Sequence, residues 1–395
     1  MTSARTSPGR RRFLTTVAAG AAAGALWASG SAQARPEDSA RQAGGRGAKA
    51  APRPLYLGTY TSEAGGGTGI GLGSYDPADG SVTLSGTLTG VDNPSFLAVS
   101  PSGGHLYAVN EQADGGVTAV AVAEDGSLTV LGTRSTGGQA PCHLSVHPGG
   151  RHLLSANYSS GSVAVHPIDE NGALGERTDL VEHTSPPSGP GQQGAHAHQI
   201  LTTPDGGHVL AVDLGTDSVY TYRLDTGAGT LEEVSVASLP AGAGPRALAF
   251  HPSGAYAYLA NELNNTIAVC AYAPETGEVT PGTPQPTGTA EGVASYPAQP
   301  LVTPDGAHVY LSNRGDNSIS RFAVGEGGAT LTLLDTVPVG GDWPRHIALS
   351  PDGGLLFASN QRSDNLTVFT VDPGSGALTE AGSSAAPVPV CALPL

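Results

Sequence analysis

The sequence has 395 residues, with 34 acidic residues against 18 lysines and arginines, and a formal net charge of −16. A chain this acidic is a poor partner for nucleic acid and for anionic membrane surfaces. Its one lysine, Lys49, precedes the first predicted strand, which excludes lysine-based covalent chemistry from the folded part and leaves arginine and histidine as its cations.

The first 34 residues have the pattern of an export signal. Three arginines at positions 10–12 precede a weakly apolar run that is rich in alanine and glycine and ends with the sequence AQA at residues 32–34. This pattern is typical of a twin-arginine signal peptide with a small-residue cleavage site. We therefore expect cleavage after Ala34, export to the cell envelope or the medium, and no stable membrane insertion of the mature protein. Retention of the run as a membrane anchor is the alternative, which the small residues disfavour.

Residues 35–53 carry glycine, alanine and charged residues without periodicity, and this composition predicts a flexible tether. Residues 1–34 hold four arginines and no acids, so their removal leaves 14 basic against 34 acidic residues. The folded part is predicted to span residues 54–395. That length suits two ordinary domains or one closed ring of sheets.

An internal repeat dominates this folded part. The tripeptide Pro-x-Gly recurs every 47 to 56 residues, each time followed by an apolar run such as HLYAVN or YAYLAN. The copies begin at Pro101, Pro148, Pro204, Pro252, Pro304 and Pro351. Proline fixes φ and glycine tolerates positive φ, so each copy predicts a tight turn between two short strands.

Each turn belongs to a unit of four predicted antiparallel strands. A run such as RALAFH precedes the turn and YAYLAN follows it, then come a third run such as NTIAVCAY and a fourth such as LTLLDTVPVG. Four antiparallel strands per repeat are typical of a propeller blade. The fold class is therefore predicted to be all-β, with no helix of 3.6-residue periodicity.

The two ends of the repeat region complement each other. The run LYLGTY at residues 55–60 resembles a second strand but has no first strand before it, whereas PVCALPL at residues 389–395 has the pattern of a first strand. We expect the C-terminal strand to join the N-terminal blade and close a seven-bladed ring without free edges. A linear solenoid is the alternative, but it lacks caps at its ends.

The start of the first strand and the end of the second strand are expected to meet at one mouth of the central channel, because the two strands are antiparallel. The second residue of the first strand is, blade by blade, Ser95, Cys142, His198, Arg246, Ala298, Arg345 and Val390. The third residue is Phe96, His143, Gln199, Ala247, Gln299, His346 and Cys391. The residue after the second strand is Tyr60, Glu111, Tyr158, Leu214, Glu262, Arg314 and Gln361. Three of the nine arginines after residue 53 fall in these sets.

This mouth supplies the candidate site. Four residues from three consecutive blades provide an imidazole, a carboxylate and two guanidinium groups, and we predict them to be catalytic: His198, Arg246, Glu262 and Arg314. Five further residues are predicted to bind substrate: His143, His196, Arg345, His346 and Gln361. The alternative is a structural role, in which such residues satisfy the polar groups of the strand ends.

Metal and cysteine chemistry are less well supported. His196 and His198 could hold zinc if Asp213 or Glu262 served as a third ligand, but no further histidine or cysteine stands at ligand spacing. No aspartate-rich loop suggests calcium. We therefore predict no metal and no cofactor. The three cysteines, at positions 142, 270 and 391, are widely spaced and are predicted to be small buried residues without a disulfide.

Several stretches of the repeats share one further pattern: HAHQ, GPRALAFHPSG, YLANEL, VTPDGAHVYLSNRG and WPRHIALSPDG followed by ASNQRSDNLTVF. Together they resemble the seven-bladed propeller lactonases, a family that includes bacterial 6-phosphogluconolactonases and fungal carboxymuconate-lactonizing enzymes. The resemblance extends from Leu55 to Leu395. It implies a site built from the histidine of HAHQ, the arginine of GPR, the glutamate of NEL and the arginine of SNRG, which are the same four candidates. The family often has a histidine after the GPR arginine, where this chain has Ala247.

The resemblance and the candidate residues predict an exported, metal-independent, monomeric lactonase that hydrolyses a sugar lactone or a related lactone. Glu262 or His198 would act as the base, and the two arginines would bind anionic groups and the developing oxyanion. A muconate-type cyclase uses the same groups in reverse and is one alternative. A non-catalytic binding propeller in the cell envelope is another.

Overall fold

The computed structural model describes residues 51–63, 66–186, 189 and 192–395. The predicted signal peptide and most of the predicted tether lie outside these residues. Strand β1 begins at Arg53, the last residue of the predicted tether. In the part of the chain that the structure describes, the only helical element is a 3₁₀ turn, η1 (Glu326–Gly328), and no helix is long and apolar enough to cross a bilayer.

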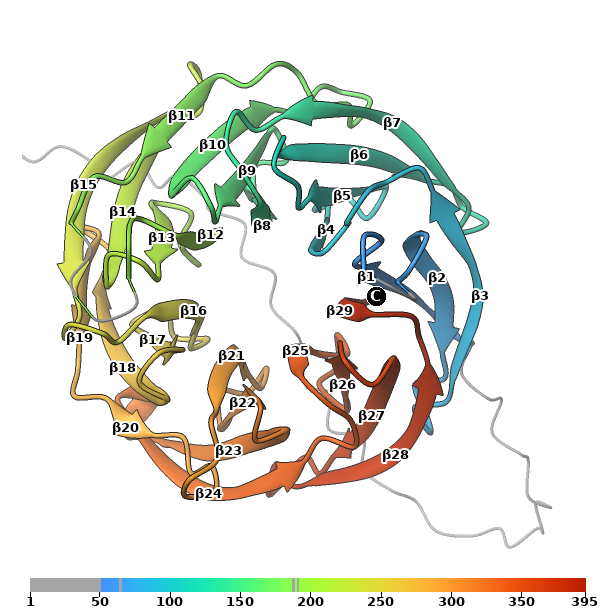
Figure 1. Cartoon of the computed structure of the whole chain (residues 1–395), viewed down its shortest axis with the longest axis vertical. Coiled ribbons are helices and arrows are strands. Elements are labelled where there is room, and N and C mark those ends of the chain that lie inside the picture. Colours follow the sequence, from blue (N-terminus) through green and yellow to red (C-terminus); the bar gives the residue numbers. More distant parts are fainter. Residues whose placement is uncertain (1–50, 64–65, 187–188, 190–191) are drawn as a thin grey trace, which may run out of the picture. The chain divides into compact units, whose positions relative to one another are not determined.

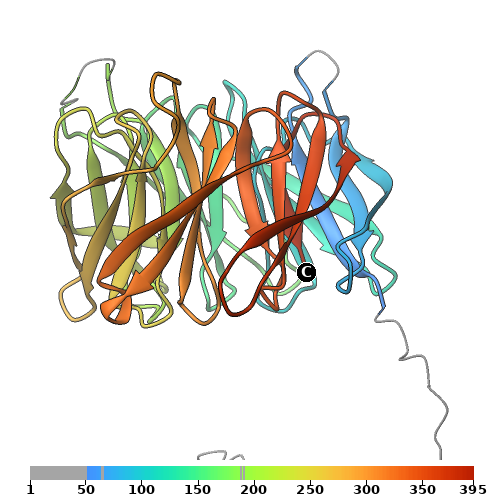
Figure 2. The ribbon, with the colours of Figure 1, turned by 90° about the horizontal axis from the view of Figure 1, so that it is seen from below.

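The strands form seven antiparallel sheets, which surround a central axis as the blades of a propeller (Figure 1). Seen from the side, the strands run between two faces that carry the turns (Figure 2). Written from the axis outward, blade 1 comprises β29 (Pro389–Pro394), β1 (Arg53–Thr59), β2 (Gly69–Tyr75) and β3 (Val82–Thr89); blade 2 comprises β4 (Leu97–Val99), β5 (His105–Asn110), β6 (Gly116–Val122) and β7 (Leu128–Ser135). Blade 3 comprises β8 (Pro141–Val146), β9 (His152–Asn157), β10 (Ser162–Pro167) and β11 (Asp179–Glu182); blade 4 comprises β12 (Ala197–Thr202), β13 (Val209–Asp213), β14 (Ser218–Asp225) and β15 (Thr230–Ser238).

The remaining blades follow the same order. Blade 5 comprises β16 (Pro245–Phe250), β17 (Tyr256–Asn261), β18 (Thr266–Ala273) and β19 (Glu278–Pro281), with β20 (Gln285–Pro286) also paired to β18. Blade 6 comprises β21 (Tyr296–Val302), β22 (His308–Arg314), β23 (Ser318–Gly325) and β24 (Thr330–Pro338). Blade 7 comprises β25 (Pro344–Leu349), β26 (Leu355–Asn360), β27 (Asn365–Val371) and β28 (Leu378–Ala385). The predicted all-β seven-bladed propeller is therefore confirmed.

Turn chemistry and burial explain why each repeat forms a blade. The glycines of the six Pro-x-Gly turns have φ between 70° and 76°, which ordinary residues adopt only with strain: Gly103, Gly150, Gly206, Gly254, Gly306 and Gly353. The second strand of a blade is packed on both faces by the neighbouring blades, so β9, β13 and β26 are buried along their whole length. The residues of the outermost strands β15 and β28 are exposed or half-buried.

The ring closes through the pairing of β29 with β1. The two strands are antiparallel, with Leu55 opposite Pro394 and Gly58 opposite Cys391. Ala392 is 1% exposed and packs in a cluster with Leu57 and Phe357, which joins blade 1 to blade 7. The predicted closure by the C-terminal strand is confirmed, and the linear solenoid is excluded.

One predicted strand is shorter than expected. The run PSFLAVS, residues 94–100, forms only the three-residue strand β4. Before β4, the amide of Ser95 donates locally to the carbonyl of Asn93 at 2.7 Å, while the carbonyl of Phe96 still accepts from Val109 of β5 at 3.1 Å.

Ring closure predicts a large difference between two identical substitutions. Ala392→Asp places a carboxylate in the apolar contact between blades 1 and 7, and we expect it to lower the free energy of unfolding by at least about 3 kcal/mol. Ala381→Asp, at an exposed position of β28, is the matched control and is expected to change it by less than about 0.5 kcal/mol. Denaturant titration followed by circular dichroism measures both. Equal effects of the two variants would contradict the closure.

Candidate active site

A bulge recurs at the start of the innermost strands. In blade 5, Pro245 pairs with Asn261 and Ala247 with Ala260, so Arg246 between them has no partner across the sheet. Such an extra residue is turned out of the regular alternation, so that two successive side chains face the channel. Five blades each have one such unpaired residue: Cys142 in blade 3, His198 in blade 4, Arg246 in blade 5, Arg345 in blade 7 and Val390 in blade 1. In blade 6 the bulge holds two residues, Ala298 and Gln299.

Backbone hydrogen bonds join the two strand ends at the mouth. The amide after the second strand donates to the carbonyl of the residue before the first strand, as from Glu262 to Gly244 at 2.7 Å and from Glu111 to Asn93 at 3.1 Å. Several of these acceptors have positive φ: Asn93, Ala140, Gly244, Trp343 and Val388. The start of the first strand and the end of the second therefore meet at one mouth, as the sequence predicts.

The four candidate catalytic residues come together at this mouth. Oε2 of Glu262 lies 2.6 Å from Nη2 of Arg314 and 3.3 Å from Nε of Arg246. Both arginines are further fixed by carbonyls, since Nη1 of Arg246 donates to Ala298 at 2.8 Å and Nε of Arg314 donates to Tyr296 at 3.1 Å. Their side chains are 5% and 6% exposed, against 18% for Glu262. One carboxylate thus holds two almost fully buried guanidinium groups.

This environment sets the charge of each group. Burial lowers the pKa of His198 well below its ordinary value, and Arg246 and Arg345 lower it further, so its imidazole is neutral. Burial by itself raises the pKa of Glu262, but Arg314 and Arg246 outweigh that effect and the pKa is lowered. The mouth therefore combines a neutral imidazole, an ionised carboxylate and fixed cations.

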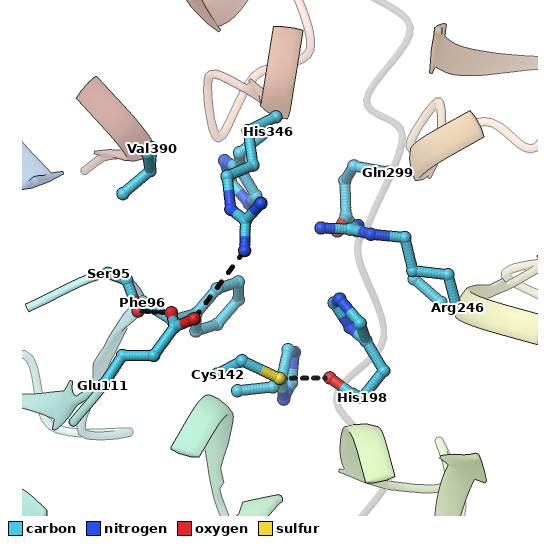
Figure 3. A pocket seen from close by; sticks show the side chains of 12 residues that line it. Ser95, Phe96, Glu111, Cys142, His198, Arg246, Gln299, His346 and Val390 are labelled. Carbon is cyan, nitrogen blue, oxygen red and sulfur yellow. Dashed lines mark hydrogen bonds and ion pairs between the residues drawn. The ribbon is translucent and has the colours of Figure 1, made fainter. Parts of the chain in front are cut away.

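Three of the four candidates, His198, Glu262 and Arg314, line a cavity of about 480 Å³, including the part open to solvent, together with Glu111, Cys142, Tyr158 and Arg345. Arg246 lines a neighbouring cavity of about 360 Å³, which also includes space open to solvent and shares Glu111, Cys142, His198 and Arg345 with the first. The second cavity is bordered by third-position residues of the inner strands, among them Phe96 and His346 (Figure 3). The two cavities therefore adjoin and share part of their lining.

The third-position residues also connect neighbouring blades. Nδ1 of His143 accepts a hydrogen bond from the amide of Ile200 at 3.4 Å, and Nδ1 of His346 accepts one from Ala392 at 3.3 Å. Burial lowers the pKa of both imidazoles to about 3. Each is therefore neutral and carries its proton on Nε2. His143 and His346 line the cavity as predicted, and they also hold adjacent inner strands together.

His196 and Gln361, which were also predicted to bind substrate, do not line either cavity. The ring of His196 stacks on Tyr158 at 4.6 Å, and its Nδ1 bonds to the carbonyl of Tyr158 at 2.9 Å. His198 meets the same tyrosine edge-on at 5.6 Å. Gln361 donates instead to Glu63 at 2.9 Å. His196 thus supports Tyr158, which does line the site.

The groups considered for a metal site have other partners. Asp213 accepts the amide of His196 at 2.9 Å and lies 2.6 Å from Nδ1 of His183, while Glu262 holds the two arginines. Within the described ranges, no group of three or more histidine, cysteine, aspartate or glutamate side chains is placed to hold a metal ion. All three cysteines are buried with free thiols, as predicted. Cys142 nevertheless belongs to the site, where its Sγ contacts the carbonyl of His198 at 3.3 Å.

The structure adds one carboxylate that was not among the predicted site residues. Glu111 lines both cavities, and its Oε2 accepts from the hydroxyl of Tyr60 at 2.9 Å. The same oxygen accepts from the hydroxyl of Ser95 (Figure 3). Arg345, a predicted binding residue, lies 3.9 Å from Oε1 of Glu111 and 5.4 Å above the ring of Tyr60. The signal was present in the sequence, because Glu111 occupies the same place after the second strand as Glu262.

Comparison with known proteins agrees with this geometry. The family model described as lactonase, seven-bladed beta-propeller, matches residues 54–394. The 6-phosphogluconolactonase of Bacillus subtilis (strain 168) is 37% identical over 299 residues, covering 73% of this chain and 83% of that protein. The 6-phosphogluconolactonase of Pectobacterium atrosepticum is 32% identical over 66% of this chain and 76% of its own length.

Solved structures with the same fold include a periplasmic gluconolactonase of Pseudomonas aeruginosa. It is 30% identical, with a TM-score of 0.81 over 87% of this chain and 99% of that chain. A protein of Lactobacillus plantarum is 35% identical, with a TM-score of 0.82 over 87% of this chain and all of its own. With a matching family model, close relatives and a shared fold, the chain belongs to the seven-bladed β-propeller lactonase family.

Proposed function

We propose that this lactonase hydrolyses the ring ester of a sugar lactone at the mouth of its channel. The observation that carries the proposal is the placement of Glu262 between two buried arginines, in one cavity with a neutral His198. Support also comes from relatives named 6-phosphogluconolactonase and from a structural neighbour named gluconolactonase.

The reaction needs an activated water and a stabilised oxyanion. Water attacks the lactone carbonyl carbon and gives its proton to Glu262 or His198, while the carbonyl oxygen gains negative charge. The guanidinium groups of Arg246 and Arg314 are fixed before the reaction by Glu262 and by backbone carbonyls, so they stabilise that charge without reorganising. The bond from the carbonyl carbon to the ring oxygen then breaks. The ring oxygen leaves as a hydroxyl with a proton from the base, and an open-chain hydroxy acid is released.

Two features complete the proposal. The guanidinium groups supply the positive charge that a metal ion supplies in other hydrolases, which supports catalysis without a metal. Export through the twin-arginine route is supported by the arginines and the AQA sequence of residues 1–34, and a structural neighbour is named as periplasmic.

Glu262→Gln is expected to lower kcat/KM for lactone hydrolysis by about 100-fold to 10,000-fold, because it removes the carboxylate while keeping its shape. Initial rates of acid release from glucono-δ-lactone in a pH-stat, corrected for spontaneous hydrolysis, measure the effect. Thermal melts of the same preparations show whether the variant is folded. Glu278→Gln, an exposed position at the start of β19, is the control. Unchanged hydrolysis by folded Glu262→Gln would favour a binding protein over an enzyme.

The activity is expected to stay level between pH 5.5 and pH 8, a range that we set around the ordinary histidine pKa of about 6.5. Because the pKa values of His198 and Glu262 are lowered, both groups take up protons only at more acidic pH. The acidic decline of the pH–activity profile is therefore expected at a lower pH than an ordinary histidine would give. The measurement is kcat/KM against pH in buffers of constant ionic strength. An acid limb centred near pH 6.5 would contradict a buried, neutral His198 as a required group.

Prolonged treatment with EDTA, followed by gel filtration into metal-free buffer, is expected to leave kcat/KM within about twofold of the untreated enzyme, because the cations of the site are arginines. Assays with added Ca²⁺, Mg²⁺ or Zn²⁺ are the companion measurement. A loss of activity that one of these ions restores would show that the site needs a metal.

A further inference from the structure

The site has two halves that differ in how their charges are paired. In one half, Oε2 of Glu262 forms ion pairs with Nη2 of Arg314 at 2.6 Å and with Nε of Arg246 at 3.3 Å. In the other half, Glu111 and Arg345 come no closer than 3.9 Å, which is too long for a hydrogen bond. The second half therefore keeps hydrogen-bonding capacity for a ligand.

The carboxylate of this half is fixed on one side only. Its Oε2 accepts from Tyr60 and from Ser95, whereas Oε1 has only the distant guanidinium of Arg345 near it. The guanidinium of Arg345 donates no hydrogen bond to any residue that the structure describes, although its side chain is only 20% exposed and lines both cavities. A free acceptor and several free donors thus face the same space.

This arrangement matches the chemistry of a hydroxyl group. A hydroxyl can donate to Oε1 of Glu111 and accept from Arg345 at the same time, and neighbouring hydroxyls of a sugar can use both groups together. A phosphate group that replaces one of these hydroxyls fits less well, because it is mostly dianionic at neutral pH and is repelled by the carboxylate of Glu111.

The charge of the whole cavity favours the same ligand. Its lining carries three guanidinium groups and two carboxylates, Arg246, Arg314, Arg345, Glu111 and Glu262, and so has a net charge of +1. The lining imidazoles of His143, His198 and His346 are neutral. One surplus positive charge balances the single oxyanion that forms on a neutral lactone. A phosphorylated lactone brings up to two more negative charges, which nothing in this lining balances.

We infer that Glu111 and Arg345, supported by Tyr60 and Ser95, form a hydroxyl-binding subsite that selects an uncharged polyhydroxylated lactone over its phosphorylated form. This subsite deepens the proposed function and rests on it, because the lactone ring is taken to lie between Glu262 and Glu111. The subsite belongs to blades 7, 1 and 2, opposite the blades that carry the four candidate catalytic residues.

The first test compares two substrates with the wild-type enzyme. We expect a higher kcat/KM for glucono-δ-lactone than for glucono-δ-lactone 6-phosphate, both measured in a pH-stat at pH 6.5. An equal or higher kcat/KM for the phosphate would overturn the inference and leave the proposed function standing. No hydrolysis of either lactone would instead refute the proposed function itself.

The second test separates the subsite from the catalytic groups with δ-valerolactone, a lactone without hydroxyls. Glu111→Gln is expected to lower the ratio of kcat/KM for glucono-δ-lactone to that for δ-valerolactone by about tenfold or more. Glu262→Gln lowers both values together and leaves the ratio unchanged, as does Glu124→Gln, an exposed residue of the β6–β7 turn. A ratio that Glu111→Gln does not alter would overturn the inference.

Tyr60→Phe keeps the test decisive if Glu111→Gln does not fold. This change removes one hydroxyl donor to Oε2 of Glu111 and keeps the aromatic ring beneath Arg345. We expect it to lower the same ratio by about threefold to tenfold, in line with the loss of one hydrogen bond to a charged group. Folded Tyr60→Phe with an unchanged ratio would count against the subsite in the same way.

Discussion

The pairing of β29 with β1 is the constraint on which the site depends. Seven blades share one channel only when the ring is closed, and closure is made by the strand that follows all others in the chain. Since each of the inner strands except β4 has a bulge near its start, side chains from around the ring are turned toward the same mouth. The site is thus a property of the ring rather than of any single blade.

The charged cluster at this mouth, taken alone, lowers the stability of the folded protein. Two guanidinium groups that are about 5% exposed lose most of their hydration, and a carboxylate with three backbone carbonyls offsets only part of that loss. Positive φ at Trp343 and Val388 adds strain at the same rim. The apolar contacts between blades, such as those of Leu57 and Phe357, carry the stability that allows a mouth of this kind. The apolar contacts between blades therefore stabilise the ring, whereas the residues at the mouth form the candidate site.

Much of the fold could be predicted from the sequence, because a proline-glycine turn repeated six times leaves few alternatives, and PVCALPL supplied the one strand that was missing. Alignment of the repeats also found the mouth, since equivalent positions in a ring face the same opening. The bulges could not be seen in this way, because nothing in the residues from Pro245 to Ala247 marks an unpaired position. For that reason His196 was assigned to the site although it lies behind Tyr158, and the role of His143 and His346 between blades was missed. Glu111 was passed over because its partners, Tyr60 and Arg345, are far from it in sequence and meet it only across the closed ring.

Because the ring closes where β29 pairs with β1, the two halves of the site become complete at different times during synthesis. Arg246, Glu262 and Arg314 come from consecutive blades and can assemble while later blades are still being made. Glu111 and Arg345 lie on opposite sides of blade 1, whose inner strand β29 is synthesised after the other strands of the ring. In a nascent chain the cluster of Glu262, Arg246 and Arg314 can therefore form before Glu111 and Arg345 are brought to the same mouth. Moving the chain ends to another blade by circular permutation would reverse that order without changing a single contact in the finished protein.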